Sequence, residues 1–143
     1  MARLEMLGFD DLDDVFNRIG NIPSEVTSAA LSSMAEVVVE RVKTAGEQMG
    51  VRDPESNVHI LDKVKAKKPK VTDDGGYCVV TFSGTRTRGN TKTRNAEIAF
   101  VNEYGKRGQS PRPFMKTAMK ADKAIAAPGE EIVGDWIEKE FKK

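Results

Sequence analysis

Residues Ala96–Met119 read AEIAFVNEYGKRGQSPRPFMKTAM, and this stretch carries the most information about the fold. It begins as an apolar segment that ends in a glutamate, an aromatic residue and a glycine, and a polar loop follows. Pro113 then opens a helix, because a proline at the first helical position gives up only an N–H that has no intrahelical partner. Nothing in the stretch has the pattern of a catalytic site.

N-terminal to this stretch, the pattern predicts two helices. Residues 9–19 place apolar side chains at helical spacing among four aspartates, which indicates a short acidic helix. These aspartates fall mostly on its outer face, which is expected to be solvated; a contact with another subunit or the lining of a lumen is the alternative. Pro23 opens a second helix, the longest element of the chain, which runs to about Met49. Gly50 ends it, because glycine readily adopts the left-handed conformation found after helices.

The middle of the chain predicts a β-hairpin with strands at 64–71 and 77–83. The connection 72–76 reads TDDGG, and glycine supplies the positive φ that a tight turn requires. Pro69 cannot donate a hydrogen bond to a neighbouring strand, so the first strand is expected at the edge of a sheet.

The remaining segments are one polar loop and two helices. Residues 84–95 contain no aliphatic or aromatic side chain, so they cannot bury an apolar face, and we expect a mobile basic loop. A helix is predicted from Pro113 to Ala127. Pro128 and Gly129 are expected to break it, and residues 129–143 form a C-terminal helix with an apolar stripe.

These elements predict an α+β fold in a single domain, residues 1–143. The long N-terminal helix packs on a small antiparallel sheet, and further helices follow at the C-terminus. A chain of 143 residues is long enough for one modest core. No stretch approaches the roughly 18 consecutive apolar residues that a membrane span needs, so no membrane partner is expected.

The formal net charge of +1 conceals a strong division along the chain. Residues 1–51 carry 4 basic and 9 acidic side chains, whereas residues 52–123 carry 16 basic and 8 acidic ones. Such a division favours an electrostatic partner, which can be another copy of the same chain. Packing of an acidic end on a basic middle is a head-to-tail contact, the kind that closes into rings.

Two groups of basic side chains are candidate contacts with DNA or with a neighbouring subunit. They are Lys63, Lys65, Lys67, Lys68, Lys70, Arg86, Arg88, Lys92 and Arg94. Such side chains neutralise phosphates without reading bases, but no aromatic residues alternate with the lysines as stacking platforms. We favour a solvated edge strand or a protein contact for the lysines and an adjacent subunit for the arginine-rich loop. Phosphate binding is the alternative for both groups.

The sequence offers no constellation for catalysis or for metal binding. Cys78 is the only cysteine and lies in a strand-like run, so a small buried apolar role is expected. His59 is the only histidine, and no ligand spacing surrounds it, so it is expected to be structural or at the surface. We expect no enzyme and no cofactor.

The order of features in Ala96–Met119 resembles the signature of a family of small head–tail joining proteins of tailed bacteriophages. Members are also described as neck, tail-completion or minor tail components. The resemblance implies that the chain turns sharply at Glu103, Tyr104 and Gly105, with Tyr104 packed under the corner. It also implies that Pro113 starts a helix that Phe114 and Met115 anchor in the core.

The resemblance further implies a structural virion protein at the head–tail junction. Copies of the chain would form a ring around the DNA channel, with adjacent connector and tail proteins and double-stranded DNA as partners. The protein would be made in the host cytoplasm and end in the virion. Two alternatives are a small basic nucleic-acid-binding module and a tail-assembly chaperone that is absent from the finished particle.

Overall fold

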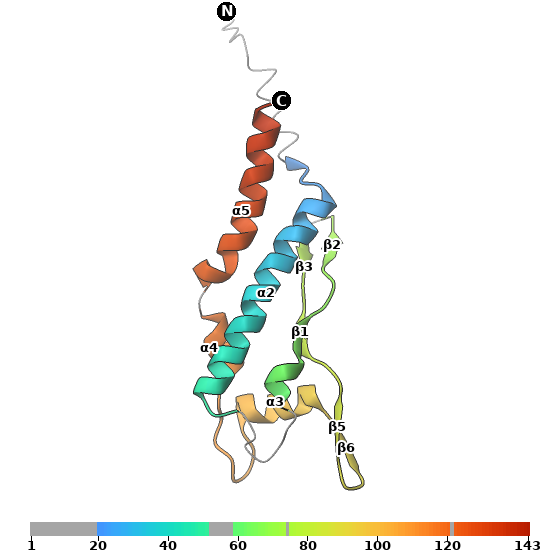
Figure 1. Ribbon diagram of the computed structural model, residues 1–143, viewed down its shortest axis with the longest axis vertical. Helices are drawn as coiled ribbons and strands as arrows, with labels where there is room; N and C mark the ends of the chain where they lie inside the picture. The colour runs from blue at the N-terminus through green and yellow to red at the C-terminus, as the bar shows by residue number, and fades with distance from the viewer. Residues whose placement is uncertain (1–19, 52–58, 74, 121) are drawn as a thin grey trace, which may run out of the picture.

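The computed structural model describes residues 20–51, 59–73, 75–120 and 122–143 (Figure 1). It has the predicted α+β fold, with a long helix, short antiparallel strands and helices at the C-terminus. The predicted helix at 9–19 lies outside the described residues. The elements are α2 (Ser24–Gln48), η1 (Ile60–Lys63), β1 (Val64–Ala66), β2 (Lys70–Thr72), β3 (Gly75–Tyr77), β4 (Val80–Phe82), β5 (Thr85–Arg88), β6 (Thr91–Arg94), α3 (Asn95–Tyr104), α4 (Phe114–Met119) and α5 (Asp122–Phe141).

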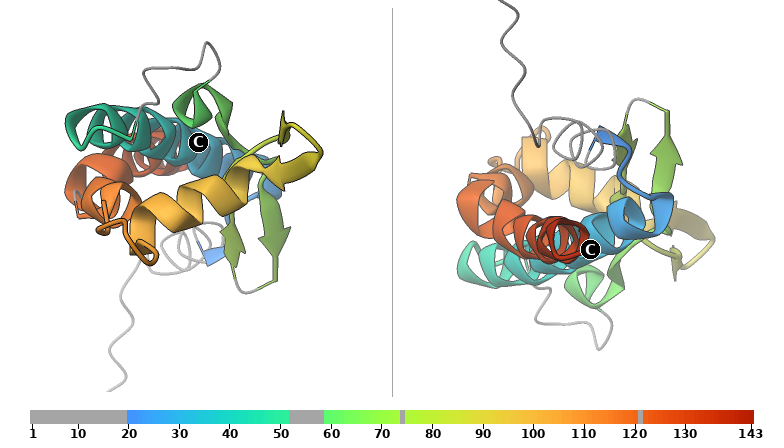
Figure 2. Two further views of the ribbon diagram at one scale, coloured as in Figure 1. Left: turned by 90° about the horizontal axis from the view of Figure 1, so that it is seen from below. Right: turned by 90° about the horizontal axis from the view of Figure 1, so that it is seen from above.

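Helix α2 is the central element, and its prediction is confirmed. Pro23 precedes its first turn, and Gly50 with φ of 69° follows its last. Small residues dominate its buried positions, which allows neighbouring elements to approach closely. Seen along the long axis of the molecule, α5 lies on one side of α2 and the strands lie on another (Figure 2). The buried positions are Ala30, Ala35, Val42, Ala45 and Gly46.

The predicted hairpin is confirmed as two antiparallel ladders with a shift in register between them. β1 pairs with β4, and β2 pairs with β3. The N–H of Lys67 still donates to the carbonyl of Val79 at 2.7 Å, but the next pair is Lys70 with Tyr77. Two residues on one strand therefore oppose one on the other, which is a β-bulge. Pro69 lies in this bulge, where its missing N–H removes no ladder bond.

Residues 84–95 were predicted to be a mobile basic loop, and the assignment as a loop is wrong. β5 and β6 form a regular antiparallel ladder across a two-residue turn at Gly89 and Asn90. Backbone hydrogen bonds build this hairpin, and they require no apolar side chains. Asn95 secures its base, because the Asn95 N–H donates to the Gly84 carbonyl at 3.0 Å and its side-chain amide donates to the Ser83 carbonyl at 2.7 Å.

The predicted helix break at Pro128 and Gly129 is also wrong. α5 runs through Pro128, and the interruption instead separates α4 from α5 after Met119. Packing on α2 explains the continuity. A Cβ placed on Gly129 would lie 2.4 Å from the sulfur of Met34, so the missing side chain lets the two helices touch. Burial against α2 thus offsets the cost of a proline within the helix.

One contiguous core lies where α2, η1, the base of the first hairpin, α3 and α4 meet. Phe114 is its most buried large side chain, with none of its surface exposed. The Phe114 ring meets the Phe82 ring edge-on, at a centroid distance of 6.0 Å. The ring pair therefore anchors β4 and α4 in the same core. Its buried members are Val42, Ala45, Val51, Ile60, Leu61, Val64, Phe82, Ala99, Phe114 and Ala118.

Candidate functional site

Glu103 occupies the centre of the corner. It lies in the last turn of α3 and is 7% exposed. One carboxylate oxygen accepts a hydrogen bond from the Met115 N–H at 2.8 Å, and the other accepts from the Lys116 N–H at 3.0 Å. These donors belong to the first turn of α4, where backbone N–H groups lack intrahelical partners and the helix dipole favours negative charge. Glu103 therefore caps α4 from another helix, because Pro113 has no side-chain acceptor.

Gly105 turns the chain out of α3, as predicted. Its φ of 77° and ψ of 177° belong to a backbone region that residues other than glycine essentially never adopt. A reciprocal backbone pair between Lys106 and Gln109 then closes the loop, with N–O distances of 3.1 and 2.9 Å. The loop also reaches across the molecule, because the guanidinium of Arg112 donates to the Gly50 carbonyl at 2.7 Å. The corner is thereby attached to the end of α2.

The helix start at Pro113 is confirmed, and so is the core anchor. α4 begins immediately after Pro113, and Phe114 fills the core. Met115 is half-buried and packs against the same cluster. At the start of α4, Phe114 is therefore fully buried in the core, whereas Met115 is only partly buried at its edge.

The expectation that Tyr104 packs under the corner is wrong. Tyr104 is 66% exposed, and Glu103 occupies the buried position. Tyr104 instead contacts the ring of Phe100, one helical turn earlier and 63% exposed, at a centroid distance of 4.7 Å. The physical reason is helical periodicity: residues four apart share a face, and Phe100 and Tyr104 lie on the open face of α3.

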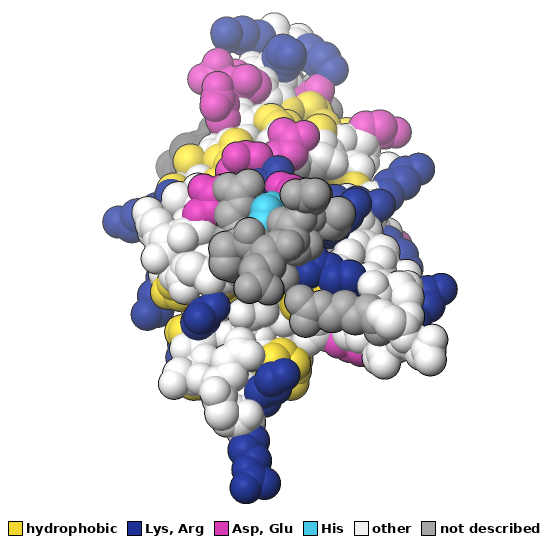
Figure 3. Space-filling view, turned by 60° about the horizontal axis from the view of Figure 1, so that its bottom comes forward, with side chains coloured by type: hydrophobic (Ala, Val, Ile, Leu, Met, Phe, Trp, Pro, Cys, Tyr) yellow, Lys and Arg dark blue, Asp and Glu magenta, His cyan; other side chains and the backbone are white. Residues whose placement is uncertain are grey.

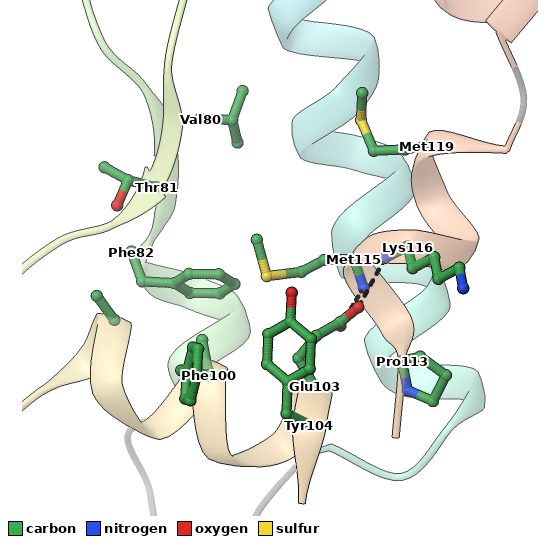
Figure 4. Close-up of a pocket in the computed structure, with 12 residues that line it drawn as sticks. Val80, Thr81, Phe82, Phe100, Glu103, Tyr104, Pro113, Met115, Lys116 and Met119 are labelled. Atoms are coloured by element: carbon green, nitrogen blue, oxygen red, sulfur yellow. Dashed lines mark hydrogen bonds between the residues drawn. The ribbon is translucent and has the colours of Figure 1, made fainter. Parts of the chain in front are cut away.

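An apolar groove opens beside this aromatic pair, between β4, α3 and α4 (Figure 4). We call it the corner groove, and its volume is about 590 Å³. Val80 and Phe82 form one wall, and Met115 and Met119 face them. A second hollow of about 330 Å³ shares Val80, Met115 and Met119 and continues along α2. Concave apolar surfaces of a few hundred Å³ are candidate binding surfaces.

We expect Glu103→Gln to lower the free energy of unfolding by about 1–2 kcal/mol, because the amide keeps one acceptor oxygen and loses the charge. Glu97→Gln is the matched control, since Glu97 is an exposed carboxylate of the same helix and pairs with exposed Arg94. The control should change stability by less than about 0.5 kcal/mol. Chemical denaturation measures both. Equal effects of the two variants would contradict a capping role for Glu103.

The structure does not gather the predicted basic residues into one site. All five lysines of the first group are exposed, and they lie in η1, in β1, in the bulge and in β2. The second group lies on β5 and β6. In Figure 1 this hairpin is at the bottom of the molecule, whereas β2 and β3 are near the top. Lys92 and Arg94 are exposed, and Arg86 is half-buried. On the face shown in Figure 3, the basic side chains are spread over the surface without forming one continuous patch.

Neither of the two residues considered for other chemistry, Cys78 and His59, is fully buried. The thiol of Cys78 donates to the Lys67 carbonyl at 3.0 Å and lines the second hollow, so Cys78 is half-buried beside the bulge. His59 precedes η1 and is half-buried. Within the described ranges, no group of three or more histidine, cysteine, aspartate or glutamate side chains is placed to hold a metal ion. None of the described helices is long and apolar enough to cross a membrane.

Sequence reasoning missed three features of the corner. The capping role of Glu103 has no local signal, because its partners follow twelve and thirteen residues later. The link from Arg112 to α2 spans 62 residues. The spacing of Phe100 and Tyr104 was the only available sign that both share one face. Comparison with known proteins adds no relative: no family model, curated protein or solved structure matches this chain.

Proposed function

We propose that this chain is a structural protein of a tailed bacteriophage that joins or completes the tail at the head–tail junction. Copies would form a ring around the DNA channel. The observation that carries the proposal is the corner: the residues behind the family resemblance form a single folded unit. Gly105 turns the chain, Pro113 starts α4, Phe114 anchors it and Glu103 caps it.

Two surface features also support a role in assembly. The corner groove and the exposed Phe100–Tyr104 pair leave large apolar side chains in contact with water. In a single copy this exposure lowers solubility, whereas a neighbouring subunit would bury it. The β5–β6 hairpin projects from the body (Figure 1), and its strands contain Arg86, Arg88, Lys92 and Arg94. Such a projection has the reach to contact an adjacent subunit.

Removal of the chain from a phage that encodes it tests the proposal. We expect filled heads and free tails to accumulate, and purified wild-type protein to restore infectious particles when it is added to the lysate. A null mutant that yields normal numbers of infectious particles would overturn the proposal. A mutant that makes no tails at all, together with absence of the chain from wild-type particles, would favour the assembly chaperone.

The hairpin's charge should matter for joining. We expect Arg88→Gln combined with Lys92→Gln to reduce the yield of infectious particles by about tenfold, since each intersubunit charge contact contributes up to about 1 kcal/mol. The same double change at exposed Lys106 and Arg107 removes equal charge from a loop outside the hairpin. Plaque counts after complementation measure both variants. An equal loss in the two would show that net charge matters and not the hairpin.

A small nucleic-acid-binding module is the second candidate, favoured by the exposed lysines of the first hairpin. Titration of duplex DNA at several salt concentrations separates the two functions. If DNA is the main ligand, the logarithm of the affinity should fall steeply with the logarithm of the salt concentration, in proportion to the phosphates contacted. For the joining role we expect weak DNA binding and a shallow slope. Tight, steeply salt-dependent binding by the isolated chain would favour the second candidate.

A further inference from the structure

We infer that the corner groove receives the acidic segment 9–19 of an adjacent copy of this chain. The inference rests on the proposed ring and names the contact that would build it. In the sequence of this segment, apolar side chains recur at helical spacing, and an amphipathic helix is one of the common occupants of an apolar groove. The apolar positions are Phe9, Leu12, Val15, Phe16 and Ile19.

The groove suits such an occupant in shape and chemistry. Its open side presents Phe100 and Met119, both at least half exposed, and Met115 lies deeper. Methionine side chains adapt to the shape of a bound apolar face, because they are unbranched and flexible. Figure 4 shows side chains from β4, α3 and α4 converging on this space from three directions. A helix that enters there would cover the aromatic pair on α3.

Charge complementarity points to the same occupant. The segment carries Asp10, Asp11, Asp13 and Asp14 against a single basic residue, so its net charge is −3. Lys116 lines the groove, and Lys120 follows directly after α4 as its C-cap residue. Both lysines are exposed. Opposite charges at the rim of an apolar contact fix orientation and speed association.

The proposed ring favours a neighbouring copy over the same copy as the source of the segment. The groove is formed by β4, α3 and α4, whereas the segment precedes α2 in the chain, so a contact between copies joins two different parts of the protein. Contact with the next copy is head-to-tail, which closes into a ring.

Two full-length variants test the inference. In the segment variant, Leu12→Glu and Phe16→Glu remove the apolar stripe. In the groove variant, Phe100→Glu and Met119→Glu charge two exposed positions, so the fold should persist. Tyr77→Glu is the matched control, because Tyr77 is equally exposed and lies on β3 outside the groove lining. Circular dichroism and thermal melting confirm that each variant is folded.

The first readout is the fluorescence anisotropy of a labelled synthetic peptide of residues 7–20 titrated with the segment variant, whose groove is intact. We expect saturable binding with a micromolar Kd, weakened at least about tenfold when the groove changes are added. Adding Tyr77→Glu should leave the affinity unchanged. Absence of saturable binding, or equal affinity in the presence of the groove changes, would overturn the inference. The requirement for this chain in head–tail joining would still be decided separately by the null mutant.

The second readout is light scattering of mixtures. Each variant alone lacks one half of the contact and should be monomeric. Their mixture keeps one complete contact, the segment of the groove variant in the groove of the segment variant, and should form a dimer that grows no further. A mixture that remains monomeric above the peptide Kd would overturn the inference. A wild-type chain that remains monomeric above that Kd would also overturn it, because the segment then occupies its own groove.

Discussion

Replacing Phe114 by alanine should lower the free energy of unfolding by about 3–5 kcal/mol, the usual cost of removing a fully buried phenylalanine ring. The ring has no exposed surface and meets Phe82 edge-on within the core that joins α2, the first hairpin, α3 and α4. The cavity would lie where four elements meet, so little collapse can fill it. Urea denaturation followed by circular dichroism measures the loss.

Phe100→Ala is the control for this prediction. It deletes the same ring from a position that is 63% exposed, so stability should change by less than about 1 kcal/mol. The control should still weaken peptide binding in the corner groove, which separates folding from assembly. Equal destabilisation by the two substitutions would contradict the assignment of Phe114 as the core anchor of the corner.

Replacing Gly105 by alanine should lower the free energy of unfolding by about 2–4 kcal/mol. Backbone strain at this φ and ψ contributes about 1–3 kcal/mol. A Cβ at this position would also lie 2.7 Å from the Gln109 carbonyl oxygen and 2.9 Å from the Pro111 nitrogen. Both are backbone atoms, so the whole loop must shift. The same denaturation experiment measures the effect.

Gly108→Ala is the comparison for a glycine with a positive φ and no steric contact. Gly108 also has a positive φ, 82°, but a Cβ there would meet nothing within 4 Å. Its cost should therefore be backbone strain alone, about 1–2 kcal/mol. The difference between the two variants reports the steric contact at Gly105 together with the greater backbone strain of its φ and ψ. A Gly105→Ala variant no less stable than Gly108→Ala would show that the loop relaxes freely and that the corner is not rigid.

The parts of the fold that local signals determine could be predicted from the sequence. The bounds of α2 are predicted by Pro23 and Gly50, and its helical structure by the apolar stripe between them. The first hairpin follows from alternation and a glycine-containing turn. The helix start at Pro113 has an equally local signal. In each case the residues that specify the element lie within it or directly beside it.

The remaining features depend on contacts between distant segments or on backbone pairing alone. α5 continues through Pro128 because Gly129 packs on Met34 of α2, which no local pattern reveals. The β5–β6 ladder contains no apolar residue, and its only signal was the Gly89–Asn90 turn. Polarity predicts an exposed Glu103 and a buried Tyr104, but the reverse is found. Glu103 is buried because its carboxylate accepts hydrogen bonds from the first turn of α4.

The most direct test of the proposed function is the position of this chain in a purified phage particle. A C-terminal tag bound by gold-labelled antibody, viewed by electron microscopy, reports that position, since the C-terminus follows α5 at the molecular surface (Figure 1). We expect the gold at the head–tail junction and nowhere else on the particle. Particles that lack the label, while the tagged chain still supports infection, would contradict a structural role at the junction.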